Sequence, residues 1–233
     1  MKALTLDGRL SSVGKFVRQG AVFADIGTDH GYLPLALLSD GVITHAVLAD
    51  INEGPLSSAR ENARDAGLYE KCSFHLGDGA RELAEFGITD IAIAGMGGEL
   101  IVDIIKNAQH LYRAGVRLIL QPMSHQRDVR RFLSENGFSI VAEDYSYSQK
   151  KYYVTIVAEY MGESYTISDT VAYFGEEKFL VPLNGEKHGY LKARLSALTK
   201  ARDGKALGGE MCEEESRLIG YINNILSTYG GGV

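Results

Sequence analysis

Short apolar runs alternate with longer segments of helical periodicity from about residue 20 to about residue 160. Five of these runs are almost continuously apolar and bounded by turn residues, a pattern typical of strands buried on both faces of a parallel sheet. They span residues 21–26, 45–50, 73–76, 91–94 and 117–121. Strands that alternate with helices form a parallel sheet covered by helices on both faces. The pattern therefore predicts an α/β fold with a Rossmann-like, mainly parallel sheet.

Two further runs, 138–144 and 151–160, are joined by a tyrosine-rich stretch at 145–149. With so short a connection, they predict a terminal antiparallel hairpin. Ser124 is the expected N-cap of the helix that precedes this hairpin, and the apolar face of the helix before that is expected to consist of Leu100, Ile101, Ile104, Ile105 and Ala108.

The pattern changes after Gly162. Residues 170–229 lack strand alternation, and their apolar residues recur at helical spacing. Gly204, Gly208 and Gly209 are expected to interrupt this segment, which predicts two helices folded as a hairpin. We therefore predict a main domain over residues 1–162 and a small helical C-terminal domain over residues 163–233.

The composition changes this picture little. Of 233 residues, 45% are hydrophobic and 23% are charged, as in ordinary soluble globular proteins, which excludes a disordered chain. No apolar run approaches the roughly 20 residues that span a bilayer, and the N-terminus does not resemble a signal peptide. The two cysteines, Cys72 and Cys212, exclude a disulfide framework, and no metal-ligand spacing occurs. We expect a cytoplasmic protein without a metal site, and no stable protein partner is implied.

The charge balance gives no general attraction for nucleic acid, because the formal net charge is −6. Any contact with nucleic acid would depend on a local patch. A solvated helix face with scattered charge would explain the best candidate equally well. This candidate is a group of basic residues: Arg113, Arg117, Arg127, Arg130, Arg131, Lys150 and Lys151.

The chemistry begins where the first predicted strand ends, in Asp25-Ile26-Gly27-Thr28-Asp29-His30-Gly31. A glycine turn between a buried strand and a helix lets a ligand approach the backbone closely. In a dinucleotide fingerprint, a second glycine would stand at the position of Asp29, and a carboxylate there repels a pyrophosphate. The turn therefore disfavours a nicotinamide cofactor and suits a cationic ligand such as S-adenosyl-L-methionine.

Further candidates follow the next strands. Asp50 ends the second strand, where an acid can accept both hydroxyls of a ribose. Gly77-Asp78-Gly79 follows the third strand and could accept a hydrogen bond from an adenine amine, although such a sequence is also a common turn. The fourth strand ends in Gly95-Met96-Gly97-Gly98, an open floor on which a base could approach the methyl donor.

Taken together, these motifs resemble bacterial tRNA (adenine-N1)-methyltransferases of the TrmK type. The resemblance covers about residues 1–160 and includes the combination of Asp29-His30-Gly31-Tyr32-Leu33-Pro34 with Gly95-Met96-Gly97-Gly98, and also Gln121-Pro122. It implies a class I S-adenosylmethionine-dependent methyltransferase domain followed by a helical C-terminal domain. The implied reaction is methylation of N1 of the adenine at position 22, in the D-arm of tRNA.

The resemblance also implies roles for individual residues. Those expected to bind S-adenosyl-L-methionine are Asp25, Gly27, Asp29, Gly31, Asp50, Gly77, Asp78, Gly79 and Gly95. Those expected to border the target base are His30, Tyr32, Met96 and Gly97. The expected catalytic set is Asp29, His30, Met96 and Gly97. Stacking partners for the base could come from Tyr32, Tyr145 and Tyr147, although tyrosines in a hairpin more often serve packing.

Several alternatives stay open. The chain could methylate another RNA or a small molecule, or it could be a cofactor-binding module without catalysis; a nicotinamide oxidoreductase is the alternative from another enzyme class. His30 could act in catalysis or only bond the backbone, and Arg9 could reach the cofactor carboxylate, the tRNA or only solvent.

Overall fold

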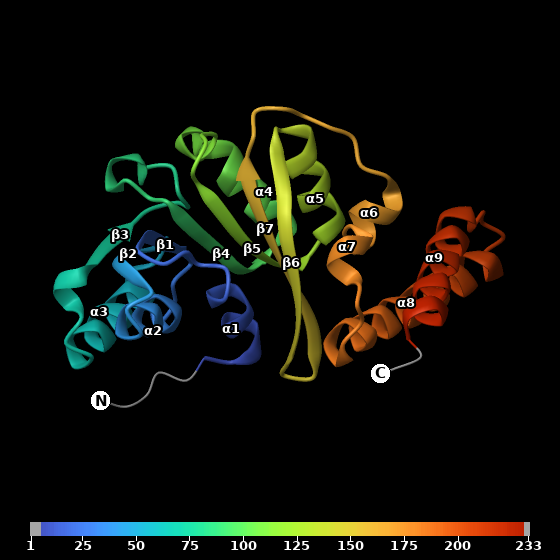
Figure 1. The fold of residues 1–233 in the computed structure, drawn as a ribbon, viewed down its shortest axis with the longest axis horizontal. Coiled ribbons are helices and arrows are strands. Elements are labelled where there is room, and N and C mark those ends of the chain that lie inside the picture. The colour runs from blue at the N-terminus through green and yellow to red at the C-terminus, as the bar shows by residue number, and fades with distance from the viewer. Residues whose placement is uncertain (1–5, 231–233) are drawn as a thin grey trace.

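The computed structural model describes residues 6–230 and contains one seven-stranded sheet, shown in Figure 1. The strand order is β3-β2-β1-β4-β5-β7-β6; β1 to β5 are parallel, and β7 is antiparallel to both β5 and β6. The strands are β1 (Ala21–Ile26), β2 (Ile43–Asp50), β3 (Cys72–Leu76), β4 (Asp90–Gly97), β5 (Arg117–Ser124), β6 (Phe138–Ser148) and β7 (Lys151–Tyr160). The predicted fold class is confirmed.

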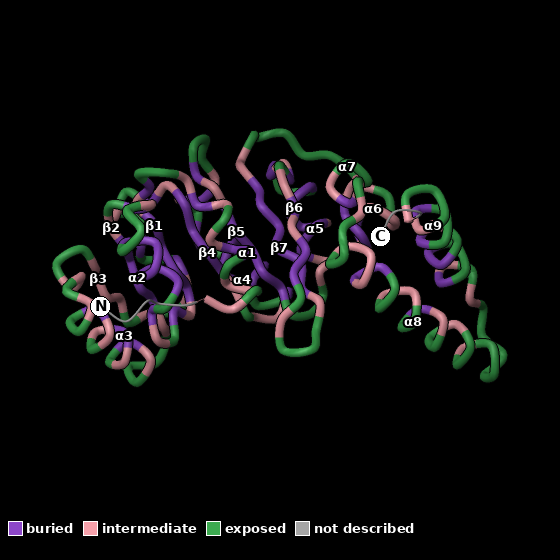
Figure 2. Tube along the Cα trace, turned by 60° about the horizontal axis from the view of Figure 1, so that its bottom comes forward, coloured by how far each residue is buried: buried purple, intermediate pink, exposed green. Residues whose placement is uncertain are grey.

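Helices cover both faces of this sheet, because its central strands are apolar on both sides. One face packs against α1 (Gly8–Gly14), α2 (Tyr32–Ser39) and α3 (Glu53–Asp65), and the other packs against α4 (Gly98–Asn107) and α5 (Gln126–Glu135). Figure 2 shows the buried strands between helices whose outer sides are exposed. Short 3₁₀ turns occur at Tyr69–Lys71, Ala84–Phe86 and Gln109–Leu111.

The C-terminal part is helical, as predicted. It consists of α6 (Asp169–Phe174), α7 (Glu177–Leu180), α8 (Gly185–Leu207) and α9 (Glu213–Tyr229), and the last two form the expected hairpin. Phe174, Leu180 and Tyr190 are buried in the same apolar cluster as the face of the sheet that carries α4 and α5. The predicted boundary at residue 162 lies in the connection between β7 and α6, and the division into two domains stays a prediction.

Four local predictions are wrong. Strand β6 continues through the tyrosine-rich stretch to Ser148, because Tyr147 pairs across the hairpin with Tyr152, with ring centroids 4.7 Å apart. Ser124 ends β5 instead of capping α5. Gly204 lies inside α8, since a single glycine costs only about 1 kcal/mol in a long helix. Leu100 is half exposed on α4, whereas its four predicted companions are buried.

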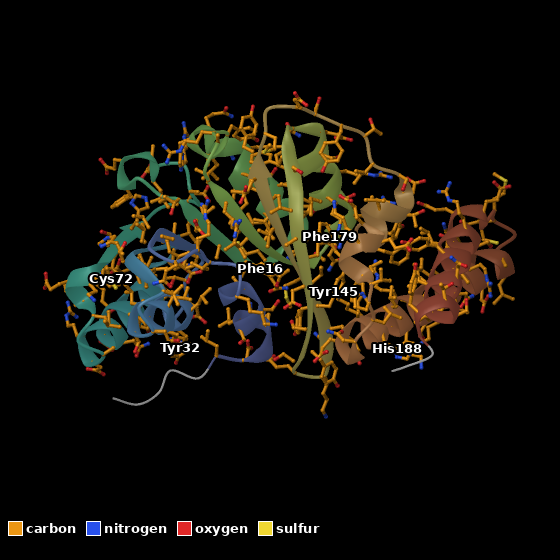
Figure 3. The ribbon with its side chains drawn as sticks, viewed as in Figure 1. Phe16, Tyr32, Cys72, Tyr145, Phe179 and His188 are labelled. Atoms are coloured by element: carbon orange, nitrogen blue, oxygen red, sulfur yellow. The ribbon has the colours of Figure 1, made fainter. Side chains whose placement is uncertain are left out.

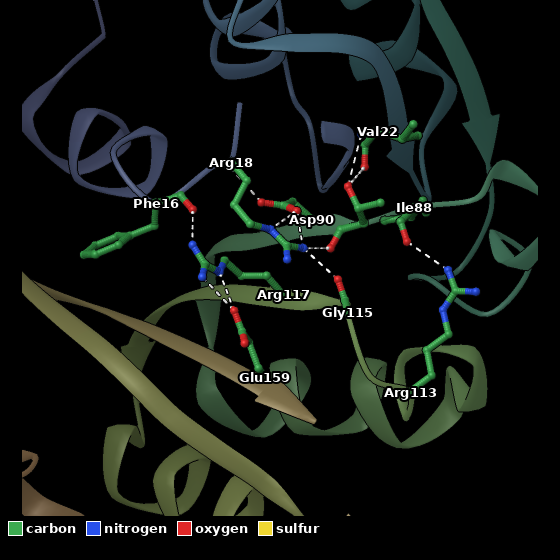
Figure 4. A network of polar contacts seen from close by, with 10 residues as sticks. Phe16, Arg18, Val22, Ile88, Asp90, Arg113, Gly115, Arg117 and Glu159 are labelled. Carbon is green, nitrogen blue, oxygen red and sulfur yellow. Dashed lines mark hydrogen bonds and ion pairs between the residues drawn. The ribbon is translucent and has the colours of Figure 1, made fainter. Parts of the chain in front are cut away.

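Ion pairs of arginines tie the amino-terminal edge of the parallel sheet to the segments around it (Figure 4). The Arg18 side chain donates to Asp90 Oδ1 from Nε at 2.9 Å and from Nη2 at 2.6 Å, and Asp90 is fully buried. Arg117 pairs with Glu159 at 2.6 Å and donates to the Phe16 carbonyl. Arg113 donates to the Ile88 carbonyl at 3.0 Å. Two members of the predicted basic patch, Arg113 and Arg117, are therefore engaged here in structural contacts.

Among the described residues, no helix is long and apolar enough to span a membrane.

Candidate active site

The carboxyl ends of β1 to β4 surround a cavity of about 290 Å³. Parallel strands end at one edge of a sheet, and ligands of such folds bind just beyond this edge. The structure brings together six of the predicted site residues in the wall of the cavity, beside Leu100 and Ile104 of α4: Gly27, Asp50, Gly77, Asp78, Gly79 and Met96. Leu100 is exposed on α4 because it faces this cavity.

Asp50 and the turn Gly77–Gly79, which follows β3, both line the cavity. Asp50 Oδ1 accepts a hydrogen bond from the backbone of Asn52 at 2.8 Å, and Oδ2 has no partner within the part of the chain that the structure describes. A Cβ atom on Gly77 would overlap His75 Nε2, and one on Gly79 would lie 3.1 Å from Ile104. Glycines at these positions let the turn pack against His75 and Ile104 while it lines the same cavity as Asp50.

Asp25 lies at the end of β1 behind the first turn, and only 7% of its surface is exposed. Its Oδ2 accepts a hydrogen bond from Thr28 Oγ1 at 2.8 Å. Burial raises the pKa of Asp25 to about 7; the Thr28 bond and the charge of Arg9 oppose this shift, and Asp50 adds to it. Such a perturbed carboxyl, two residues from a cavity-lining glycine, is typical of a functional site.

Met96 lies over the first turn. Gly27 has a φ of +71°, and a Cβ atom there would overlap the Met96 methyl carbon, so only glycine fits below this side chain. Gly97 precedes α4 as its N-cap residue and lies next to Ser124 of β5. The β4 half of the predicted catalytic set is therefore at the cavity or directly beside it.

The other half of that set follows β1 and is exposed. Asp29 has a φ of +51°, and its carboxylate lies 3.4 Å from His30 Nε2. The His30 ring lies 5.3 Å from the ring of Tyr32, which is 46% exposed at the start of α2 (Figure 3). Gly31 packs closely against β2, because a Cβ atom there would lie 2.8 Å from Leu48. None of Asp29, His30 and Gly31 lines the cavity itself.

Sequence reasoning assigned no role to Gln121, which is fully buried on β5. Its Oε1 accepts hydrogen bonds from the backbone of Gly95 at 3.0 Å and from Arg9 Nη1 at 3.1 Å. Gly95 has a φ of +77°, and the Arg9 guanidinium lies against it. Arg9 therefore lies at the carboxyl end of β4, and its role toward a cofactor or tRNA stays a prediction. The contact joins residues 112 positions apart, so no local signal could predict it.

The basic patch predicted for RNA is wrong at Arg130, which is fully buried. Its guanidinium donates to both oxygens of Glu143, at 2.6 and 3.2 Å, and to the carbonyls of Ala172 and Tyr173. Tyr145 is also buried and bonds Glu143, so it cannot stack on a base; Figure 3 shows it beside the C-terminal helices. Patch residue Arg131 pairs with Asp169. These residues join β6 and α5 to the C-terminal part.

No group of three or more His, Cys, Asp or Glu side chains within residues 6–230 could hold a metal ion.

The sheet order, the glycine turn after β1 and the acid that ends β2 define a Rossmann-like methyltransferase. A family profile described as "Methyltransferase domain" matches residues 6–156. The tRNA (adenine(22)-N(1))-methyltransferase of Bacillus subtilis (strain 168) is 35% identical over 159 residues, which cover 68% of this chain and 67% of that protein. The chain belongs to the family of tRNA (adenine(22)-N1)-methyltransferases.

Two solved structures extend the similarity beyond the methyltransferase domain. Streptococcus pneumoniae Sp1610, in complex with S-adenosyl-L-methionine, is 32% identical with a TM-score of 0.82, over 95% of this chain and 100% of that chain. The TrmK of M. capricolum, in complex with S-adenosyl-homocysteine, is 26% identical with a TM-score of 0.76, over 97% of this chain and 98% of that chain. Both similarities therefore include the C-terminal helices of this chain.

Proposed function

We propose that this protein transfers the methyl group of S-adenosyl-L-methionine to N1 of the adenine at position 22 of tRNA. The observation that carries the proposal is the cavity in which Gly27, Asp50 and Asp78 meet at the carboxyl edge of the sheet. The name of the Bacillus subtilis relative supports the acceptor, and the complex of Sp1610 supports the methyl donor. Because tRNA is the proposed acceptor, we expect the enzyme in the cytoplasm.

The residues of the cavity fit this methyl donor. The free oxygen of Asp50 suits the ribose hydroxyls, and Asp78 in its glycine turn suits the adenine amine. Asp25 and Arg9 offer opposite charges at the ends of β1 and β4, which suits the ammonium and carboxylate of a methionine group. Of the other predicted residues, Gly31 shapes the turn after β1, and Asp29 contributes a negative charge beside that turn.

When bound, S-adenosyl-L-methionine supplies an electrophilic methyl group on a positively charged sulfur. The acceptor nitrogen is unprotonated at neutral pH, so the protein needs no strong base before attack. Its main contribution is to hold donor and acceptor in line, with Met96 at the end of β4 in the wall of the cavity. The positive charge that passes to the adenine would be stabilised by the carboxylate of Asp29, with His30 beside it.

The target atom belongs to the Watson–Crick edge of the base, so the adenine has to be unpaired or turned out of its stack. The half-exposed ring of Tyr32, with the His30 ring beside it, provides a stacking surface at the β1 turn. We assign the reaction to residues 1–162 and treat residues 163–233 as a helical domain beside the site.

The test is methyl transfer from labelled S-adenosyl-L-methionine to bulk bacterial tRNA, followed by nucleoside analysis. We expect 1-methyladenosine, and no product in a transcript that carries guanine at position 22. A different methylated nucleoside, or no transfer by protein that binds the donor, would contradict the proposal and favour another acceptor or a non-catalytic module. Tight binding of NADH without binding of S-adenosyl-L-methionine would favour an oxidoreductase.

A further inference from the structure

A second cavity, of about 430 Å³, lies between the corner from β5 to α5 and the C-terminal helices. It begins at Ser124, the register partner of Gly97 in the parallel pair β4–β5. The cavity therefore starts where the open floor of the first site ends, on the same edge of the sheet. An RNA whose adenine lay over Gly95–Gly97 would continue toward this cavity.

Arg194 of α8 lines the cavity and has an unsatisfied guanidinium. Its Nε is buried without a hydrogen-bond partner, and no carboxylate of residues 6–230 forms an ion pair with it. Other cations nearby are paired, for example Arg131 and Arg217 with Asp169. A guanidinium without an ionic partner favours an anionic ligand in the cavity that it lines.

Arg127 also lines the cavity and is held in place. It lies over the Tyr173 ring at 5.1 Å and donates to the Tyr173 hydroxyl at 3.1 Å. Asp128 and Glu214, each 3.4 Å away, pair with it, so Arg194 is the guanidinium in the wall of this cavity that has no paired carboxylate within residues 6–230. The cavity also opens over the first turn of α5, which has no side-chain cap and leaves backbone N–H groups for an anion.

We propose that this cavity binds a backbone phosphate of the tRNA close to the target adenosine, with Arg194 as its principal contact. The inference deepens the proposed function and rests on it. A guanidinium and helix N–H groups match the geometry of a phosphate. Contacts to phosphate position an RNA without reading its sequence, so the cavity would fix where the adenine lies and leave its identity to the first site.

The test compares Arg194→Gln with Lys192→Gln in binding of fluorescently labelled tRNA at several salt concentrations. Lys192 is exposed on the same helix, about 200° around the helix axis, and forms no ion pair within the described residues, so both variants remove one charge. We expect Arg194→Gln to weaken tRNA binding about tenfold and to lower the salt slope by about 1, and Lys192→Gln to stay within about twofold of the parent. Arg194→Lys should recover part of the loss.

Equal effects of the two glutamine variants on tRNA binding, or an unchanged salt slope in Arg194→Gln, would overturn the inference. Both variants should bind S-adenosyl-L-methionine and unfold thermally like the parent, which separates a lost contact from a lost fold. Methyl transfer by the parent protein is measured in parallel. An absence of transfer counts against the proposed function, whereas the binding comparison decides the role of the cavity in either case.

Discussion

Both edges of the parallel sheet carry acidic residues, but these residues are paired with arginines at one edge and unpaired at the other. At the amino-terminal edge, Asp90 and Glu159 are paired with Arg18 and Arg117, and the cations also donate to backbone carbonyls. At the carboxyl edge, Asp25, Asp50 and Asp78 have no ion pair among the described residues, and glycines with positive φ lie between them.

The difference separates stability from function along one sheet. Buried charges that are paired contribute to a defined fold, whereas buried or crowded charges without a partner destabilise the empty protein and become useful when a ligand supplies the partner. Changes at the amino-terminal edge should therefore alter the free energy of unfolding. Changes at the carboxyl edge should alter cofactor affinity.

The largest effect is expected for Asp90→Ala. It leaves the Arg18 guanidinium, which is only about one third exposed, without its carboxylate, and should lower the free energy of unfolding by about 3 kcal/mol. Urea denaturation measures this loss, with Asp40→Ala, an exposed aspartate, as the control. Affinity for S-adenosyl-L-methionine should be unchanged in folded protein, and a parallel loss of affinity would break the comparison.

The next largest effect is expected for Asp50→Ala. Hydrogen bonds to a charged group contribute about 1.5–3 kcal/mol, so the Kd for S-adenosyl-L-methionine should rise about 10- to 100-fold in calorimetric titration. The stability should change little, because only the bond from Asn52 is lost. Unchanged affinity would remove Asp50 from the binding site.

Asp25→Asn should have opposite effects on stability and on binding. The pKa of Asp25 is about 7 in the folded protein and about 4 when unfolded, so the folded state retains a proton that the unfolded state releases. The parent therefore loses stability as pH rises from about 4 to 7, and Asp25→Asn should be more stable than the parent at pH 8 and about equal to it at pH 4.

Binding gives the complementary result for Asp25. A cationic ligand favours the ionised carboxyl, so the parent should bind S-adenosyl-L-methionine more weakly below pH 7, and Asp25→Asn should bind weakly without this pH dependence. Thermal unfolding and titration across pH 5–8 measure both effects. If the stabilities of the parent and of Asp25→Asn changed with pH in the same way, burial would not be the cause of the raised pKa of Asp25.

The smallest effect is expected for Arg117→Ala. Arg117 and Glu159 are each about one quarter exposed, so solvent and salt screen their pairing, and the loss should be about 1 kcal/mol or less and smaller still in 1 M salt. Urea denaturation at two salt concentrations is sufficient. A loss as large as that of Asp90→Ala would show that exposure does not control the strength of pairs at this edge.

The sequence predicted those parts of the molecule that depend on local pattern. Strand β1 lies at residues 21–26 as expected, and the turns at Gly27, Asp50 and Gly77–Gly79 meet at one cavity because parallel strands end at one edge. The glycine-rich end of β4 contributes Met96 to the same cavity.

Long-range contacts could not be predicted in this way. A count of charges does not distinguish Arg130 from Arg127. In the structure, Arg130 is buried in an ion pair with Glu143, whereas Arg127 lines a cavity. Tyr145 and Tyr147 are two residues apart and lie on the same face of β6. Only Tyr145 is buried, because Tyr190 of α8 packs on it with ring centroids 4.8 Å apart. Which arginine or tyrosine is accessible depends on helices that lie far away in the sequence.

Hydrogen–deuterium exchange with and without S-adenosyl-L-methionine tests the separation of the two edges most directly. We predict that the cofactor slows exchange in peptides that cover residues 25–31, 50–52, 77–79 and 94–97, and leaves residues 16–20, 88–90 and 115–117 unchanged. Protection at the amino-terminal edge, or none at the carboxyl edge in protein saturated with the cofactor, would contradict the account.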